Sequence, residues 1–177
     1  TLAQKYKLPI DQPADLKNFS AQGGSGRMTG QLNVVVDYGA LIPQEIINTP
    51  KFGTINIHPS LLPKYRGASP IQSVLMNSEK ITGVSIMQMD EEMDHGPILA
   101  QEKTTITPDD TYATLYEKLA MQAGQLLVKT IPLYINGEIK PQIQNHEEAT
   151  FTKILSREDG KINFAEKTAE EIYNLYR

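Results

Sequence analysis

The chain of 177 residues is long enough for one domain, and 40% hydrophobic residues are enough for a core. The absence of cysteine excludes disulfides, thiolate metal ligands and cysteine nucleophiles, and it fits a reducing compartment, so we expect a cytoplasmic protein. A net charge of −4 gives no overall attraction to nucleic acid, and the apolar runs are far too short to span a membrane.

The first 31 residues contain few regular patterns. Residues 1–7 resemble the end of a helix, Leu8-Pro9-Ile10 predicts a short extended piece, and residues 15–19 could open another helix. The Gly/Ser-rich stretch at 22–30 has the composition of a flexible linker. Because an α/β domain normally begins with a strand, we expect the N-terminal strand or strands to be missing from this sequence.

From residue 32 onward, strand and helix patterns alternate, which predicts an α/β fold. Residues 32–36 are nearly all apolar and β-branched, so this strand should be buried on both faces. Further strands are expected at 54–58, 82–89 and 98–105, the last two as neighbours. Helices are expected at 40–48, 68–77, 111–134 and 168–177. The apolar stripe of the longest helix should cover the sheet, and Pro132 should limit its end.

Polar and apolar residues alternate through the strand expected at 54–58 and just beyond it. In an extended segment Asn56, His58 and Ser60 point to one side, and the apolar residues between them point to the other. A half-buried edge strand would alternate in the same way. However, Leu61-Leu62-Pro63 ends this strand, because proline cannot continue a central ladder, and a cationic loop follows. The polar residues therefore lie at the carboxyl end of a strand, where open α/β sheets place their ligands.

A second group of polar residues, Asp90, Glu91, Glu92, Asp94 and His95, occupies six positions before a glycine-proline turn. Such a run is usually a solvated loop, and the alternative is a loop with one carboxylate turned inward to meet a histidine. We expect Asp94 to be the inward one and the other carboxylates to face solvent. The polar surroundings of His146 predict a surface position.

An imidazole, a carboxylate and an amide held together can transfer an acyl group to an amine. The acceptor amine must lose a proton, the carbonyl oxygen gains negative charge, and the leaving nitrogen must be protonated. Histidine can handle the protons, a carboxylate can hold the imidazolium or a water, and an asparagine amide can donate to the oxyanion. Ser60 lies close to His58 in sequence but lacks the sharp elbow of a nucleophilic serine, so no covalent intermediate is expected.

Several separated motifs resemble those of the folate-dependent formyltransferases. They are Asn56-x-His58-x-Ser60-Leu61-Leu62-Pro63, Tyr65-Arg66-Gly67-Ala68-x-Pro70-Ile71 and Met93-Asp94-x-Gly96. The segments RGASPIQ, GVSIMQMDEEMDHGPIL and TKILSREDGKINFAEKTAEEIYNLYR are most similar to the members of that family that act on methionyl-tRNA. The resemblance covers nearly the whole chain apart from residues 17–33.

The resemblance implies a Rossmann-like domain with a mostly parallel sheet and 10-formyltetrahydrofolate as co-substrate, without a metal. Asn56 would hold the formyl oxygen, His58 would polarise it and handle protons, and Asp94 would orient His58 and relay through water. Two segments would bind the folate, in part through backbone groups: Tyr38, Gly39, Leu41, Ile42, Pro43, Ser60, Leu61, Leu62 and Pro63. Arg66 and Gly67 would fall beside the same cleft.

The same resemblance implies that residues 1–145 form a catalytic domain and that residues 146–177 begin a linker toward a missing C-terminal barrel. The acceptor would be the α-amino group of initiator methionyl-tRNA, held mainly through missing segments; we expect a monomer and no membrane partner. The sequence departs from the family pattern at Asp37, where a small residue is expected, and a carboxylate beside a folate pocket carries a penalty. A helix is also expected where the Gly/Ser-rich stretch occurs.

Three alternatives remain open at this point. The acceptor could be glycinamide ribonucleotide or a sugar-nucleotide amine. The chain could be a catalytically incomplete fragment that binds folate or nothing. A zinc hydrolase using His58, Asp94 and His95 is a third possibility, although the spacing of these residues matches no zinc motif.

Overall fold

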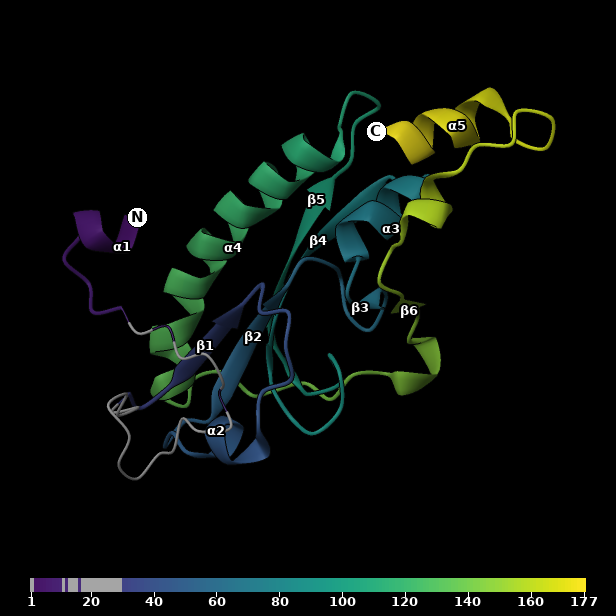
Figure 1. Ribbon diagram of the computed structural model, residues 1–177. Coiled ribbons are helices and arrows are strands. Elements are labelled where there is room, and N and C mark those ends of the chain that lie inside the picture. Colours follow the sequence, from purple (N-terminus) through teal and green to yellow (C-terminus); the bar gives the residue numbers. More distant parts are fainter. Residues whose placement is uncertain (1, 11, 13–15, 17–29) are drawn as a thin grey trace.

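A four-stranded sheet forms the centre of the protein (Figure 1). The computed structural model describes residues 2–10, 12, 16 and 30–177. The strands of the sheet, in spatial order, are β1 (Asn33–Val36), β2 (Thr54–His58), β4 (Ile81–Gln88) and β5 (Ile98–Thr105). The sequence located all four, with differences of about one residue at their ends.

The α/β class is confirmed, but the described strands are less parallel than expected. Within the four-stranded sheet only β1 and β2 run parallel, whereas β2 with β4 and β4 with β5 are antiparallel. The strands β4 and β5 are joined by a nine-residue connection, residues 89–97. A connection this short can join two neighbouring strands only if they are antiparallel, because two parallel neighbours need a longer crossover.

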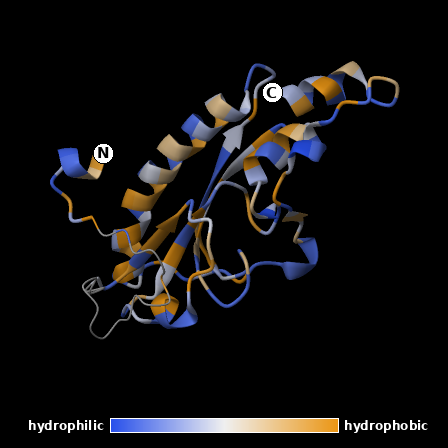
Figure 2. Ribbon diagram, viewed as in Figure 1, coloured by the Kyte–Doolittle hydropathy of each residue, from blue (hydrophilic) through white to orange (hydrophobic). Residues whose placement is uncertain are grey.

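Helices cover one face of this sheet. The helix α3 (Pro70–Met76) and the long helix α4 (Tyr112–Ile135) contact each other, and α4 also contacts β4 and β5. In Figure 2, α4 alternates along its length between hydrophobic and hydrophilic residues, as an amphipathic helix does. Its buried Leu115 and Leu119 join Ile55 and Ile57 of β2 in one core. Since the side chains of a strand alternate, Asn56 and His58 must lie on the other face of β2.

The strand β1 differs from its prediction of burial on both faces. It pairs only with β2 among the described strands, and Val34 and Val36 are 39% and 58% exposed. The β-branched, apolar composition identified the strand correctly. It could not show how much of each face other elements cover.

The helix α4 begins as predicted but passes through Pro132. Thr111 caps its N-terminus, where its hydroxyl accepts a hydrogen bond from the backbone N–H of Thr114. Proline removes only one backbone donor, and the helix continues to Ile135. It ends where Gly137, at φ +75°, adopts the left-handed conformation that glycine favours.

A small parallel pair formed by β3 (Arg66–Gly67) and β6 (Phe151–Thr152) was not predicted. Two-residue strands have no periodicity, so they leave no signal in the sequence. The remaining elements are α1 (Leu2–Lys5), α2 (Gln44–Asn48), α5 (Ala169–Tyr176) and the 3-10 helices η2 (His146–Glu148) and η3 (Arg157–Gly160). The chain after α4 crosses toward β3 and then reaches α3 (Figure 1).

Polar contacts hold α5, although its sequence pattern placed apolar residues on one face. Tyr176 is 82% exposed, whereas Asn174 and Arg177 are buried. Asn174 donates to the Ser78 hydroxyl, and the Arg177 guanidinium donates to the carbonyl oxygens of Thr107 and Asp110. These bonds attach the helix to the turn after α3 and to the loop that precedes α4.

Two expectations fall outside the described residues: the helix opening at 15–19 and most of the linker at 22–30. Of the helices in the described part of the chain, none combines the length and hydropathy that a membrane span requires.

The buried carboxylate of Asp110 should make the stability of the protein depend on pH. Burial alone would raise the pKa of Asp110, but hydrogen bonds from Lys118, Thr107 and Thr114 outweigh burial and lower it from 3.8 to about 2. A lowered folded-state pKa stabilises the protein above the unfolded pKa, and this contribution is lost as the pH falls from about 4 to about 2. We expect Asp110→Asn to reduce the free energy of unfolding by roughly 2 kcal/mol at pH 7 and by less near pH 2.

Denaturant titrations of the protein and of Asp110→Asn between pH 2 and pH 7 would measure this difference. The exposed neighbour Asp109 provides a matched control, because Asp109→Asn makes the same chemical change. A difference between the protein and Asp110→Asn that stays constant over the whole pH range would contradict the prediction.

Candidate active site

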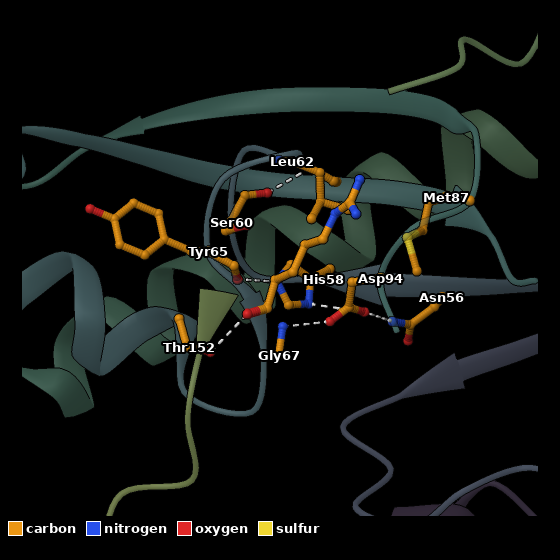
Figure 3. Close-up of polar contacts among 12 residues, drawn as sticks. Asn56, His58, Ser60, Leu62, Tyr65, Gly67, Met87, Asp94 and Thr152 are labelled. Carbon is orange, nitrogen blue, oxygen red and sulfur yellow. Dashed lines mark hydrogen bonds and ion pairs between the residues drawn. The ribbon is translucent and has the colours of Figure 1, made fainter. Parts of the chain in front are cut away.

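The candidate site lies on the face of β2 that the helices leave uncovered. There Asn56 and His58 point to the same side, and their partners across the ladder are Met87 and Ser85 of β4. The strand β2 is paired on both edges, to β1 and to β4, so the simple interpretation of an edge strand is wrong. Figure 3 shows that Asp94 reaches His58 and Asn56 from a different part of the chain.

The hydrogen bonds of His58 determine which ring nitrogen can exchange a proton. The ring is buried, with Nε2 2.8 Å from the carbonyl oxygen of Tyr65. A carbonyl oxygen only accepts, so Nε2 carries the hydrogen and donates it. The other nitrogen, Nδ1, lies 3.5 Å from Oδ1 of Asp94. Nδ1 is therefore the ring nitrogen without a backbone partner, and it lies on the side of the carboxylate.

The carboxylate of Asp94 is held at both oxygens. Oδ2 accepts the backbone N–H of Gly67 at 2.8 Å, and Oδ1 accepts Nδ2 of Asn56 at 3.3 Å. Its side chain is 10% exposed, which confirms the prediction that this carboxylate turns inward. An amide has two N–H donors, so Asn56 can donate to Asp94 with one and to a substrate oxygen with the other.

Among the other carboxylates of the acidic loop (Asp90–Gly96), Glu91 and Glu92 are exposed as predicted, but Asp90 does not simply face solvent. Asp90 is half-buried and its Oδ2 lies 2.7 Å from Nδ1 of His95. The ring of His95 stacks on that of His146, with centroids 4.0 Å apart. His146 is exposed as predicted, but it also contacts the Arg66 guanidinium through Nδ1 at 2.9 Å. A charge pattern gives no information about which ring each carboxylate meets.

Backbone groups and one glutamine complete the site. Two of these groups, the carbonyl of Tyr65 and the side chain of Gln144, were not predicted from the sequence. The carbonyl of Tyr65 carries no side-chain signal, although its residue has φ +61°, a conformation that few non-glycine residues adopt. Gln144 contacts both Arg66 and the acidic loop. Gln144 belongs to none of the motifs identified in the sequence.

The residues expected to bind folate fall into two groups. The first follows β1: Tyr38 and Leu41 are 48% and 97% exposed, Gly39 is exposed, and Ile42 and Pro43 are half-buried. Because β1 and β2 are parallel, with Val36 opposite Ile57, this segment begins at the carboxyl ends of the two strands, where His58 also lies.

The second group follows β2 and is more buried. Ser60 is fully buried, and its hydroxyl donates to the carbonyl oxygen of Lys64 at 2.6 Å. Leu62 is buried beside Ser85, while Leu61 and Pro63 are half-buried. The hydroxyl of Ser60 thus shapes the loop that carries Tyr65.

A cavity of about 230 Å³ lies behind this loop. The side chain of Tyr65 lines it and donates to Glu79 at 2.6 Å; burial, with Glu79 adding to it, raises the pKa of the Tyr65 hydroxyl. The other residues that line the cavity are Lys64, Ser73, Met76, Asn77, Glu79, Thr150, Phe151 and Thr152. Asn56, His58 and Asp94 are not among them, so this cavity is separate from the candidate site.

Nothing in the described ranges brings three or more His, Asp or Glu side chains together as metal ligands. His95, which the zinc alternative required beside His58, instead pairs with Asp90. These positions therefore do not support the zinc hydrolase interpretation.

Comparison with known proteins shows the family to which this chain belongs. The family model described as formyl transferase matches residues 14–131, and the chain belongs to this family. It is similar to the methionyl-tRNA formyltransferases of Sulfurihydrogenibium sp., at 42% identity, and of Thermodesulfovibrio yellowstonii, at 44%. Each match covers 99% of this chain and 56% of the relative. The chain thus spans about half the length of these curated relatives.

Solved structures agree with this family. An N-formyltransferase from Helicobacter canadensis, in complex with folinic acid and dTDP-3-aminofucose, is 31% identical with a TM-score of 0.63. That match covers 76% of this chain and 51% of the other. HypX from Aquifex aeolicus, in complex with tetrahydrofolic acid, has a TM-score of 0.72 over 82% of this chain and 25% of its own. At 20% identity, HypX supports the fold alone.

Proposed function

We propose that this chain is the catalytic part of an enzyme that transfers a formyl group from 10-formyltetrahydrofolate to the α-amino group of initiator methionyl-tRNA. The observation that carries the proposal is the convergence of Asn56, His58 and Asp94 on the face of β2 opposite the described helices. The names of the curated relatives support methionyl-tRNA as the acceptor.

In the proposed reaction, the acceptor nitrogen attacks the formyl carbon and the bond from that carbon to the folate nitrogen breaks. Asn56 donates an N–H to the formyl oxygen, which becomes negative as the attack proceeds. The acceptor amine loses one proton and the folate nitrogen gains one, so protons balance. His58 handles these protons at Nδ1, because Nε2 is committed to the carbonyl oxygen of Tyr65.

Asp94 stabilises the protonated form of His58 and holds its ring toward the reacting atoms. Its 3.5 Å separation from Nδ1 is longer than a direct hydrogen bond, which leaves room for adjustment when substrate binds. A water beside the carboxylate would serve as the relay between Asp94 and the amine. Each of the three side chains then has one role.

The folate co-substrate is assigned to the segment after β1 and to the loop after β2. Tyr38 and Leu41 expose apolar surface that a pterin ring would cover, and Gly39 leaves backbone groups accessible beside them. Ile42 and Pro43 would line the same side, with Ser60, Leu61, Leu62 and Pro63 forming the opposite wall. A 29%-identical sugar formyltransferase solved with 5-N-formyl-THF supports a folate site in this fold.

We assign residues 1–145 to the catalytic domain and residues 146–177 to a linker that leads toward a further domain of the full enzyme. A net charge of −4 gives no overall electrostatic attraction to tRNA, so we assign most of the tRNA binding to segments outside this sequence. The proposed enzyme is a monomer that acts in the cytoplasm.

Single-turnover formyl transfer by this chain would test the proposal. 10-Formyltetrahydrofolate would be offered with methionyl-tRNA, with glycinamide ribonucleotide and with an amino sugar nucleotide in separate reactions, and His58→Ala would serve as the control. We expect transfer to methionyl-tRNA alone and a large loss of transfer in His58→Ala, because the proposed reaction moves its protons through the imidazole of His58.

A sugar-nucleotide amine is the second candidate acceptor, since the Helicobacter canadensis structure contains dTDP-3-aminofucose. Faster transfer to the amino sugar nucleotide would favour this acceptor over methionyl-tRNA. If a folded chain binds folate but transfers to no acceptor, the fragment is catalytically incomplete and only the folate assignment stands.

A further inference from the structure

We infer that Gln144 is a positioning residue that holds Asp94 against His58 from the far side of the acidic loop. This inference rests on the role proposed above for Asp94. Gln144 lies in the chain after α4, at least 48 residues from the groups it contacts in the loop. Nothing in the motifs around Asn56, His58 or Asp94 includes it.

Gln144 joins the two segments that surround Asp94. Its Oε1 accepts from Nε and Nη2 of Arg66 at 3.2 and 2.7 Å. Its Nε2 donates to the backbone oxygens of Asp94 and Gly96 at 2.9 and 2.7 Å. The side chain is 4% exposed, so these bonds form away from water, where leaving a partner unsatisfied is costly.

The hydrogen bonds of Gln144 to Arg66 and to the acidic loop (the bridge) affect both the carboxylate and the backbone of Asp94. Arg66 and Gly67 form β3, and the backbone N–H of Gly67 is the donor to Oδ2 of Asp94. Gln144 therefore holds β3 in place by accepting from Arg66. It holds the backbone of Asp94 in place by donating to the Asp94 carbonyl oxygen. One side chain thereby sets the distance between the Gly67 donor and the carboxylate that it holds.

The backbone of Asp94 needs such support. Its φ of +52° lies in the left-handed region, which costs a non-glycine residue free energy unless the surroundings impose it. The hydrogen bonds from Gln144 to the carbonyls on either side of His95 restrain the backbone at this point. Without them, the loop can relax toward an ordinary conformation and carry the carboxylate away from His58.

Hydrogen exchange in Gln144→Met, which keeps the length of the side chain but removes all its hydrogen bonds, tests this inference without an activity assay. We expect the Gly67 amide to exchange about tenfold faster, because that factor corresponds to the net free energy of one hydrogen bond. The Ile86 amide in the core of β4 reports global opening and should change much less. Equal acceleration at both amides would mean that Gln144 acts only through stability, and the inference would be wrong.

Two further variants sharpen the test. Gln144→Glu keeps an acceptor for Arg66 but cannot donate to the loop when ionised, so Gly67 should exchange as fast as in Gln144→Met; protection like that of the unsubstituted protein would overturn the inference. Gln122→Met makes the same substitution on α4, where the side chain donates to the backbone carbonyl oxygen of Lys103, and should leave the exchange of the Gly67 amide unchanged.

Formyl transfer supplies an independent measurement. In Gln144→Met we expect kcat to fall on the order of 10- to 100-fold with little change in KM for folate, as misplacing a catalytic group by about 1 Å produces. A chain that transfers no formyl group would contradict the proposed function, and the exchange of Gly67 would still decide the role of Gln144. Faster exchange at Gly67 with unchanged kcat would show that the bridge does not position Asp94 for catalysis.

Discussion

Replacement of Asp94 by asparagine should lower the rate of formyl transfer by roughly 10²- to 10⁴-fold, the usual range for losing acid–base assistance. The substitution removes the negative charge that faces Nδ1 of His58 at 3.5 Å and would stabilise the imidazolium during proton transfer. It also places an NH₂ group where one carboxylate oxygen accepted from Gly67 or Asn56, so two donors would face each other. The geometry and the charge of the site are both lost.

Asp90→Asn is the matched control for this experiment. Asp90 belongs to the same acidic loop but pairs with His95 rather than His58. We expect Asp90→Asn to keep most of the rate in a single-turnover assay, and both variants should unfold cooperatively in a denaturant titration. A folded Asp94→Asn protein with unimpaired transfer would remove Asp94 from the mechanism.

Alanine in place of Gly96 should destabilise the protein, whereas alanine in place of Gly124 should stabilise it. A Cβ atom on Gly96 would lie 2.0 Å from the backbone oxygen of Gln88, so the acidic loop would have to move away from the end of β4. We expect the free energy of unfolding to fall by about 1–3 kcal/mol, as for other overpacked sites. Displacement of the loop would also move Asp94, so formyl transfer should decrease.

Gly124 lies in the middle of α4, and a Cβ there would meet nothing within 4 Å. Glycine inside a helix costs about 0.5–1 kcal/mol relative to alanine, and Gly124→Ala should recover up to that amount. Urea unfolding of the two variants measures both free energies. If both substitutions changed the free energy of unfolding in the same direction, the close approach at Gly96 would not govern stability.

Much of the secondary structure and part of the site followed from local patterns. Alternation placed Asn56 and His58 on one face of a strand, and that face lies opposite the helices in the described part of the chain. The inward position of Asp94 was predicted from its place before the next strand, and the structure agrees. Period and composition are properties of neighbouring residues, so they can be seen in one sequence.

Other features depend on residues that are far apart in the chain. The exposed face of β1, the direction of β4 and the β3–β6 pair depend on which elements meet, and no single segment contains that information. The contribution of Tyr65 and Gly67 to the site comes from a carbonyl and an N–H, which almost every residue has.

The sequence by itself determined the four strands of the central sheet, the long helix α4 and the polar residues of β2 that face the site, because each of these follows from local spacing. Only the tertiary structure decided which nitrogen of His58 is free and what holds Asp94, since those answers come from hydrogen bonds between distant segments. Gln144 illustrates the difference: 50 residues separate it from Asp94, and the fold brings its amide within 2.9 Å of the Asp94 carbonyl oxygen.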